Sequence, residues 1–263
     1  MFLPRLRDQH HKPPLVNRSN SPISIESVLA AADALLPEFR AAVDAIPEEE
    51  RGRGIFLSEM FLFHCVVRPL KPRQILESGR ALGGSTLTLA HCFPDVRIVS
   101  VELDAASSNN AIALDRLAPY RNVECLFGDS REILPPLVQS SDAVLIDGPK
   151  EFRALKLALN LLKTGKPSVV FLHDCPAGSR WRKFINDYWP NAFFSDHPEF
   201  LRRFSYLDDF GQSPRSWRRA RPTTFACLPG NSAAPYRLLL AKLVLARALW
   251  LAPSKIGDWL RSS

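Results

Sequence analysis

The chain has 263 residues, of which 46% are hydrophobic, and carries a formal net charge of +7. This length suits one large α/β domain with additions or two small domains, with ample material for a core. No apolar run reaches the roughly 20 residues of a membrane helix, so we expect no span. The five cysteines form no C-x-x-C pair, and the N-terminal stretch lacks the apolar core of a signal peptide. Both features favour buried free thiols in a cytoplasmic protein.

The N-terminal part of the chain is predicted to be an arm followed by helices. Residues 1–23 are rich in Pro, Arg, His and Asn, which is typical of a flexible arm. Apolar residues then recur at helical spacing over 25–46, with Ser24 as the expected N-cap and Ser27 as a later alternative. Pro37 lies inside this span, so we expect a kink or two shorter helices. A second helix is predicted over residues 57–67.

Residues 74–104 form the stretch around which the chain is organised. The pattern is a short apolar strand, a turn with glycines, a helix, and a second strand rich in β-branched residues. Glycine lets a backbone approach a ligand closely, and a helix N-terminus suits a carboxylate or phosphate. An acid at the tip of the second strand can accept hydrogen bonds from ribose hydroxyls. The residues concerned are Glu77, Gly79, Gly83, Gly84, Ser85 and Glu102.

These features together predict a site for an adenosine-type cofactor. The glycines run G-x-x-x-G-G, whereas a dinucleotide-binding turn requires G-x-G-x-x-G. A Walker loop would require a Gly-Lys-Ser/Thr sequence, and none occurs here. The two common phosphate-binding motifs are therefore not the ones present.

Strands and helices alternate through the rest of the core. Helices are predicted over 107–117, 130–134 and 156–162, ended by Pro119, Pro135 and Gly165, and strands over 123–127, 143–146 and 168–172. This rhythm predicts an α/β fold with a doubly wound, Rossmann-like, mostly parallel sheet. One acid at a strand end is as often a helix cap, but five on one rim favour a ligand site. These five are Glu77, Glu102, Asp129, Asp147 and Asp174.

The motifs resemble those of a known enzyme family. The pattern E-x-G-x-x-x-G-x-S at residues 77–85, with a following strand that ends V-E-L-D, resembles the S-adenosylmethionine site of class I methyltransferases. The nearest branches are the catechol O-methyltransferase-like and the macrocin or cephalosporin-cluster enzymes. G-D-S at 128–130, A-V-L-I-D-G-P-K at 143–150 and F-L-H-D-C at 171–175 follow in the family's order, so the resemblance covers about 54–175. It implies cofactor contacts at Glu77, Gly79, Gly83, Ser85, Glu102, Asp129, Ser130 and Asp147.

The resemblance also implies an O-methyltransferase chemistry. Asp147 and Asp174 match acids that hold Mg²⁺, and Lys150 matches a general-base lysine, a role that requires a lowered pKa. Related metal-dependent enzymes have Asp or Asn after the second acid, whereas this chain has Cys175, a poor ligand for a hard cation. His173 is then a substitute ligand or base, or a strand-end histidine bound to the backbone. Lys150 as an ordinary surface lysine also stays open.

Residues 176–230 combine aromatic side chains with many arginines, densest in R-S-W-R-R-A-R at 215–221. Such a mixture can bind nucleic acid by stacking and phosphate contact. Interspersed acids, and the lack of both a recognition motif and an N/D-P-P-Y/F motif, argue against a nucleic-acid methyltransferase. We favour aromatic residues that complete the sheet edge, with arginines that line an acceptor cleft or are solvated. A small-molecule or glycan acceptor, such as an acidic sugar or a phosphorylated compound, would suit that cleft.

The last segment, YRLLLAKLVLARALWL at 236–251, is predicted to be a helix too short and too charged to span a bilayer. Packing on the domain or on a second subunit is favoured over contact of 236–261 with an anionic membrane surface.

The expected organisation is an arm (1–23), a methyltransferase-like domain (24–230) and a helical extension (231–263). Within the domain, N-terminal helices occupy 24–70, the core 71–175 and the aromatic and basic region 176–230. The main alternative to an enzyme is a methyltransferase-like binding or assembly protein. In the resembled families a helix at 57–67 packs near the cofactor, so Glu59 lies either close to it or in solvent.

Overall fold

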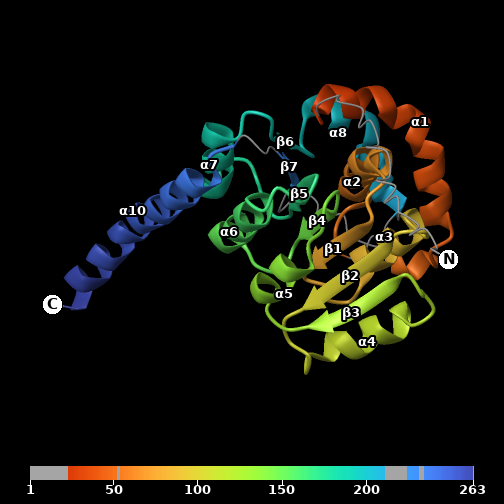
Figure 1. The fold of residues 1–263 in the computed structure, drawn as a ribbon, viewed down its shortest axis with the longest axis horizontal. Coiled ribbons are helices and arrows are strands. Elements are labelled where there is room, and N and C mark those ends of the chain that lie inside the picture. The colour runs from red at the N-terminus through yellow and green to blue at the C-terminus, as the bar shows by residue number, and fades with distance from the viewer. Residues whose placement is uncertain (1–22, 52–53, 211–223, 231–233, 263) are drawn as a thin grey trace, which may run out of the picture.

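The computed structural model describes residues 23–51, 54–210, 224–230 and 234–262. A seven-stranded sheet in the order β3-β2-β1-β4-β5-β7-β6 lies between two layers of helices (Figure 1). Strands β1 to β5 pair in parallel, and β7 runs antiparallel to β5 and β6. The predicted doubly wound, mostly parallel sheet is therefore confirmed. The strands are β1 (Gln74–Ser78), β2 (Arg97–Glu102), β3 (Val123–Phe127), β4 (Ala143–Ile146), β5 (Val169–Leu172), β6 (Phe193–Phe194) and β7 (Ala226–Pro229).

Strand β1 is the point from which the sheet grows in both directions. Its residue Ser78 pairs with Val101 of β2 on one side and with Ile146 of β4 on the other. The connections that leave β1 and β4 therefore diverge to opposite faces, which opens a crevice at the carboxyl ends of the strands. The acids at the ends of β2 and β4 are placed beside this crevice.

Helices cover both faces of the sheet because the strands alternate buried side chains between two hydrophobic clusters. Ile75, for example, packs towards α1, α2, α3 and α8, whereas Leu76 packs towards α5, α6, α7 and α10. The helices are α1 (Ile25–Asp44), α2 (Leu57–Leu70), α3 (Gly84–Cys92), α4 (Ser108–Leu117), α5 (Ser130–Leu137), α6 (Glu151–Leu162), α7 (Arg180–Tyr188), α8 (Pro198–Phe204) and α10 (Tyr236–Ser262). Two 3₁₀ turns, η1 (Glu48–Glu50) and η2 (Ser205–Phe210), complete the described elements.

Several helices extend beyond their predicted bounds, among them α2, which ends at residue 70 rather than 67. Helix α1 is one helix through Pro37 rather than two shorter ones, and Phe39 and Val43 beyond the proline are buried. Helix α5 runs past Pro135 to residue 137, where buried side chains on either side of the prolines hold it. Helix α6 begins at residue 151 rather than 156. Tertiary burial outweighs the local cost of proline in α1 and α5.

Helix α10 confirms the predicted C-terminal helix and packs on α6 through Tyr236, Leu239 and Leu243. Its far end points away from the body of the molecule (Figure 1). Among the helices that the structure describes, none has the length and hydropathy to cross a membrane. The predicted arm (1–23), apart from Ile23, and the basic segment 215–221 lie outside the described residues. The five cysteines are free thiols, four of them buried as predicted and Cys125 half-buried.

Candidate functional site

A cavity of about 840 Å³ lies at the carboxyl ends of the central strands. Five residues that the sequence singled out line it: Gly79 after β1, Glu102 at the end of β2, Asp129 and Ser130 after β3, and Lys150 after β4. They come from four separate segments and meet only because the strands are parallel and adjacent. A volume of this size is in the range that holds small-molecule ligands in proteins.

Glu102 joins the glycine turn to the end of β2. Its Oε2 accepts the backbone N–H groups of Arg80 at 3.0 Å and Ala81 at 2.7 Å, and its Oε1 accepts that of Leu103 at 2.8 Å. A carboxylate offers about four lone-pair positions, so one on Oε1 stays available to a ligand hydroxyl. Glu102 therefore both shapes the turn and faces the cavity.

Gly79 and Gly148 form the floor of the cavity by close approach of two backbones. Gly79 has φ +90°, and a Cβ built on it would lie 2.3 Å from the backbone nitrogen of Gly148. A Cβ on Gly148 would in turn lie 2.7 Å from the Ser78 hydroxyl. Only glycine at both positions lets the loops after β1 and β4 pack at this distance.

Glu77, Gly83 and Ser85 are three further residues that the sequence predicts as cofactor contacts. Glu77 lies inside β1 and is fully buried, and its carboxylate accepts hydrogen bonds from the hydroxyls of Ser85 at 2.5 Å, of Ser100 at 2.6 Å and of Thr86. Burial raises the pKa of Glu77. Gly83, with φ +81°, is the N-cap of α3. These three residues do not line the cavity. They lie under the glycine turn and support its conformation.

Asp129 and Ser130 connect β3 to α5. Asp129 caps the helix by accepting the Arg131 N–H at 2.9 Å, and it also accepts the Arg131 guanidinium Nε at 2.9 Å. The hydrogen bond from that guanidinium lowers the pKa of Asp129. The Ser78 hydroxyl donates to the Ser130 hydroxyl at 2.7 Å, which fixes this corner of the cavity against β1.

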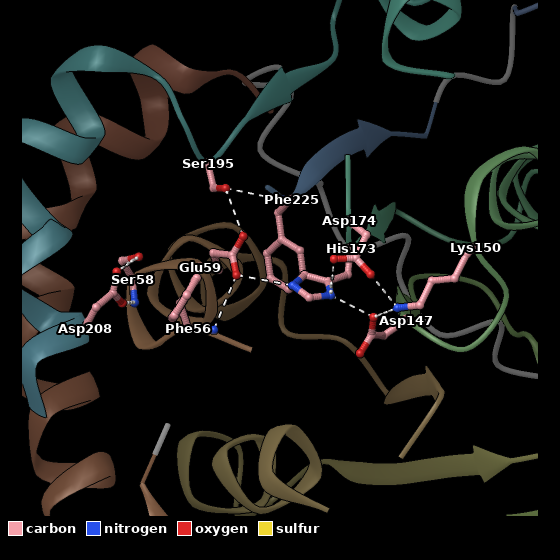
Figure 2. A network of polar contacts seen from close by, with 10 residues as sticks. All are labelled: Phe56, Ser58, Glu59, Asp147, Lys150, His173, Asp174, Ser195, Asp208 and Phe225. Carbon is pink, nitrogen blue, oxygen red and sulfur yellow. Dashed lines mark hydrogen bonds and ion pairs between the residues drawn. The ribbon is translucent and has the colours of Figure 1, made fainter. Parts of the chain in front are cut away.

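Beside the cavity, five charged side chains form a cluster in which every contact joins an acid to a base (Figure 2). Glu59 lies 3.4 Å from His173 Nε2, and His173 Nδ1 lies 2.7 Å from Asp147 Oδ1 and 3.6 Å from Asp174 Oδ1. The Lys150 ammonium bridges Asp147 Oδ1 at 2.5 Å and Asp174 Oδ2 at 2.7 Å. Asp147 and Asp174 therefore both join His173 to Lys150, and Glu59 reaches His173 from the other side of the imidazole. The cluster combines α2 with the loops after β4 and β5.

This arrangement shifts the pKa of three of these groups. Burial opposes the charge on His173, but the Glu59 and Asp147 carboxylates outweigh it and raise its pKa to about 10. Burial likewise opposes the charge on Asp147, yet His173 and Lys150 lower its pKa to about 2. Burial acts against the charge of Lys150 too, and Asp147 and Asp174 raise its pKa. These shifts favour the protonated forms of Lys150 and His173, whereas a general base needs a lowered pKa.

Asp147 keeps one free oxygen. Both cationic neighbours bind its Oδ1, and Oδ2 has no hydrogen-bond partner among the described residues. Asp147 is not among the residues that line the cavity, but Gly148 and Lys150 on its C-terminal side are. It therefore carries an ionised acceptor atom without a described partner next to the cavity.

Glu59 is a site residue whose role the sequence left open. It is buried, and its carboxylate accepts the Phe56 N–H at 3.3 Å and the Ser195 hydroxyl at 3.4 Å. Ser195 also accepts the Phe225 N–H at 2.9 Å, which connects α2 to the antiparallel edge of the sheet. The available signal was that Glu59 is the one acid in a 14-residue helix that is otherwise mostly apolar. A buried acid of this kind needs a partner.

The predicted metal site is a candidate by geometry. Donor atoms of Asp147, His173 and Asp174 lie within 4.8 Å of one another. However, the Lys150 ammonium already bridges the two carboxylates, and His173 carries a proton on the nitrogen that would bind metal. Cys175 points elsewhere, being buried with its pKa raised by burial to about 12. Mg²⁺ prefers a set of oxygen ligands, and this set does not fit it, so no reaction step is assigned to a metal.

Replacement of Lys150 tests this conclusion. In Lys150→Met the bridging ammonium is lost, and two neighbouring carboxylates face each other. We expect Mn²⁺ and Mg²⁺ to bind this variant about 10-fold or more tightly than the wild type, because the competing cation is gone. Calorimetric titration with each ion measures the difference, with Lys183→Met, on the outer face of α7, as the control. Equal affinities in all three proteins would show that Lys150 does not compete with a metal.

Removal of the Glu59 charge should change the pH dependence of stability. The folded-state pKa of His173, about 10, exceeds its ordinary value of 6.5. Protonated His173 therefore stabilises the fold fully below about pH 6.5, and this contribution declines as the pH rises to about 10. In Glu59→Gln we expect a lower His173 pKa and a smaller decline in unfolding free energy over this window. Urea unfolding from pH 6 to 10 and NMR titration of the imidazole check this, with exposed Glu199→Gln as the control.

Comparison with known proteins finds similar solved structures. No protein-family model and no curated protein matches the chain. It is similar to the O-methyltransferase TomG from Streptomyces achromogenes, in complex with SAM, at 22% identity over 79% of this chain and 97% of that chain, with a TM-score of 0.46. A putative caffeoyl-CoA O-methyltransferase from Staphylococcus aureus is 18% identical over 76% and 92%, with a TM-score of 0.41. The SAH-bound Podospora anserina methyltransferase PaMTH1 is 17% identical over 84% and 99%, with a TM-score of 0.39. Likeness at this level carries no conclusion about activity.

Proposed function

We propose that this chain is an S-adenosylmethionine-dependent methyltransferase that acts on an oxygen atom of a small molecule or glycan. The observation that carries the proposal is the cavity, which brings together the glycine turn, Glu102, the pair Asp129–Ser130 and Lys150. The glycine turn, Glu102 and Asp129–Ser130 offer contacts for an adenosine group, as the sequence motifs imply. Lys150 belongs to the charge cluster in which Asp147 has a free acceptor oxygen.

The reaction is an in-line displacement at the methyl carbon. A lone pair of the acceptor oxygen forms the new C–O bond, the C–S bond breaks, and its electron pair goes to sulfur, which becomes a neutral thioether. The acceptor hydroxyl gains acidity as its oxygen becomes positive. Asp147 Oδ2 then accepts the hydroxyl proton of the acceptor. A carboxylate of low pKa can take this proton because an alkylated oxonium is a strong acid.

The neighbours of Asp147 act as positioning residues in this scheme. His173 and Lys150 bind the same Asp147 oxygen from two sides, which fixes the carboxylate plane and leaves the other oxygen open. Glu59 keeps His173 protonated and therefore a donor. The methyl group itself needs orientation more than activation, since the sulfonium is already a good leaving group.

Calorimetric titration with S-adenosylhomocysteine is the first test. The wild type should bind it, and Glu102→Gln should bind it about 10-fold more weakly, because the acceptor for a ribose hydroxyl is altered. Unfolding of the variant is measured alongside, since Glu102 also holds the turn. Glu124→Gln, exposed on β3, is the control. Wild-type protein that does not bind the compound would overturn the proposal, and binding without methyl transfer to any acceptor in a screen with labelled S-adenosylmethionine would favour the binding-protein alternative.

A further inference from the structure

One part of the cavity lining, which we call the wall, is rich in arginine and aromatic residues and comes from helices outside the strand-end motifs. Arginines line it from four helices, α5, α6, α7 and α10, and aromatic residues from three of them, with Glu151 of α6 as the one acid that these helices add. No residue there belongs to the glycine turn or to the strand ends that the sequence pattern identified. The arginines are Arg131, Arg153, Arg180 and Arg247, and the rings are Phe152, Trp181 and Trp250.

Three of these arginines have uncompensated charge. Arg131 pairs with Asp129. By contrast, Arg153, Arg180 and Arg247 form no ion pair with any carboxylate that the structure describes, and all three are exposed at the cavity. Guanidinium groups that line one cavity without acid partners give it a positive potential, which favours the binding of an anion. A guanidinium is also the side chain best suited to bind a carboxylate or phosphate through two parallel hydrogen bonds.

Helix α10 is held in position at this wall. The ring of Trp250 packs on Phe152 of α6 with centroids 4.8 Å apart, and its carbonyl accepts Arg180 Nη1 at 3.1 Å. Lys242 lies over the ring of Tyr188 at 4.3 Å, a second contact between α10 and α7. These contacts place Arg247, one turn before Trp250, at the cavity. The C-terminal helix is thus part of the site and more than a terminal extension.

The wall is also connected to the charge cluster. Trp181 donates its indole N–H to the Asp174 carbonyl at 3.1 Å, and Asp174 binds Lys150. The first turn of α7 therefore contacts the charge cluster through Trp181 and α10 through Arg180.

From these observations we propose that α7 and α10 form the acceptor-binding wall, and that the acceptor is a ring compound carrying a phosphate or carboxylate group. The inference rests on the proposed methyltransferase function and adds the chemical class of its substrate. The oxyanion binds between Arg180 and Arg247, and the ring lies against Trp250 and Trp181.

Calorimetry with small probes tests the wall directly. Phenyl phosphate, benzoate and the neutral benzyl alcohol are titrated into the protein saturated with S-adenosylhomocysteine. We expect the two anions to bind about 10-fold or more tightly than the alcohol, with the better of the two defining phosphate or carboxylate as the group recognised. Arg180→Met and Arg247→Met should each weaken anion binding about 10-fold, and Trp250→Leu should weaken all three probes. Arg237→Met, also exposed on α10 but outside the cavity, should change nothing.

The outcomes separate this inference from the proposed function. If S-adenosylhomocysteine binds but the arginine variants hold the anions as tightly as the wild type, the acceptor wall is wrong and the cofactor site stands. If the arginine variants weaken S-adenosylhomocysteine itself, the arginines serve the cofactor carboxylate, and the inference is again overturned. If S-adenosylhomocysteine does not bind at all, the proposed function fails. Titration of the anions in its absence then shows whether the wall binds oxyanions on its own.

Discussion

Gly79→Ala should abolish binding of S-adenosylhomocysteine. A methyl group at this position would lie 2.3 Å from the backbone nitrogen of Gly148 and 2.5 Å from its Cα, and backbone atoms cannot rotate away as a side chain could. The residue also has φ +90°, which disfavours any side chain. The loops after β1 and β4 must therefore separate, and the turn that carries the Glu102 contacts moves with them. We expect an affinity loss of about 100-fold or more and destabilisation of about 2–4 kcal/mol.

The control isolates the clash from the backbone strain. Gly165, after α6, also has positive φ, +69°, but a Cβ there meets nothing within 4 Å. Gly165→Ala should therefore cost only about 1–2 kcal/mol of stability and leave the affinity unchanged. Calorimetry and urea unfolding on the two variants measure both quantities. Equal, small effects in both variants would mean that the close approach of Gly79 and Gly148 does not shape the cavity.

The sequence predicted the sheet because its signals are local. A β-branched run such as 96–101, bounded by turn residues, needs no distant partner to be recognised as a strand. The acids at strand ends were predictable for the same reason, since the parallel sheet brings all such ends to one edge. Helix boundaries were less accurate at prolines, where burial of Phe39 beyond Pro37 depends on contacts that no local pattern reveals.

The chemistry of the site was harder to predict because it depends on which groups meet. The family resemblance implies a base role for Lys150 and leaves His173 as a ligand, a base or a histidine bound to the backbone, but it does not reveal the carboxylates that raise the pKa of both. One partner of His173 is Glu59, from a helix more than 100 residues earlier, and its burial could not be read from spacing. Glu77 is a residue of the sequence motif, but its carboxylate binds three hydroxyl groups under the turn and does not face the cavity.

Asp147→Asn should remove most of the catalytic rate while it preserves the shape of the site. The amide is nearly isosteric with the carboxylate, and one amide oxygen can still accept a hydrogen bond from His173 or Lys150. The substitution removes the ionised Oδ2, which we propose takes the proton from the hydroxyl group of the acceptor substrate. General-base catalysis typically contributes about 10²–10⁴-fold, so we expect kcat to fall by that factor with the affinity for S-adenosylhomocysteine changed by less than about 5-fold.

Two further measurements distinguish a catalytic loss from a structural one. The pKa of Asp147 is lowered from 3.8 to about 2, so its charge stabilises the fold above about pH 3.8 and the effect is lost as the pH falls through about 2. The variant is therefore less stable at pH 7, and urea unfolding shows whether it is still folded in the assay. Asp187→Asn, in the exposed pair with Lys183 on α7, should leave kcat as in the wild type. A folded Asp147→Asn protein that retains more than about a tenth of the wild-type kcat would rule out Asp147 as the proton acceptor, because a base that matters cannot be removed at so small a cost.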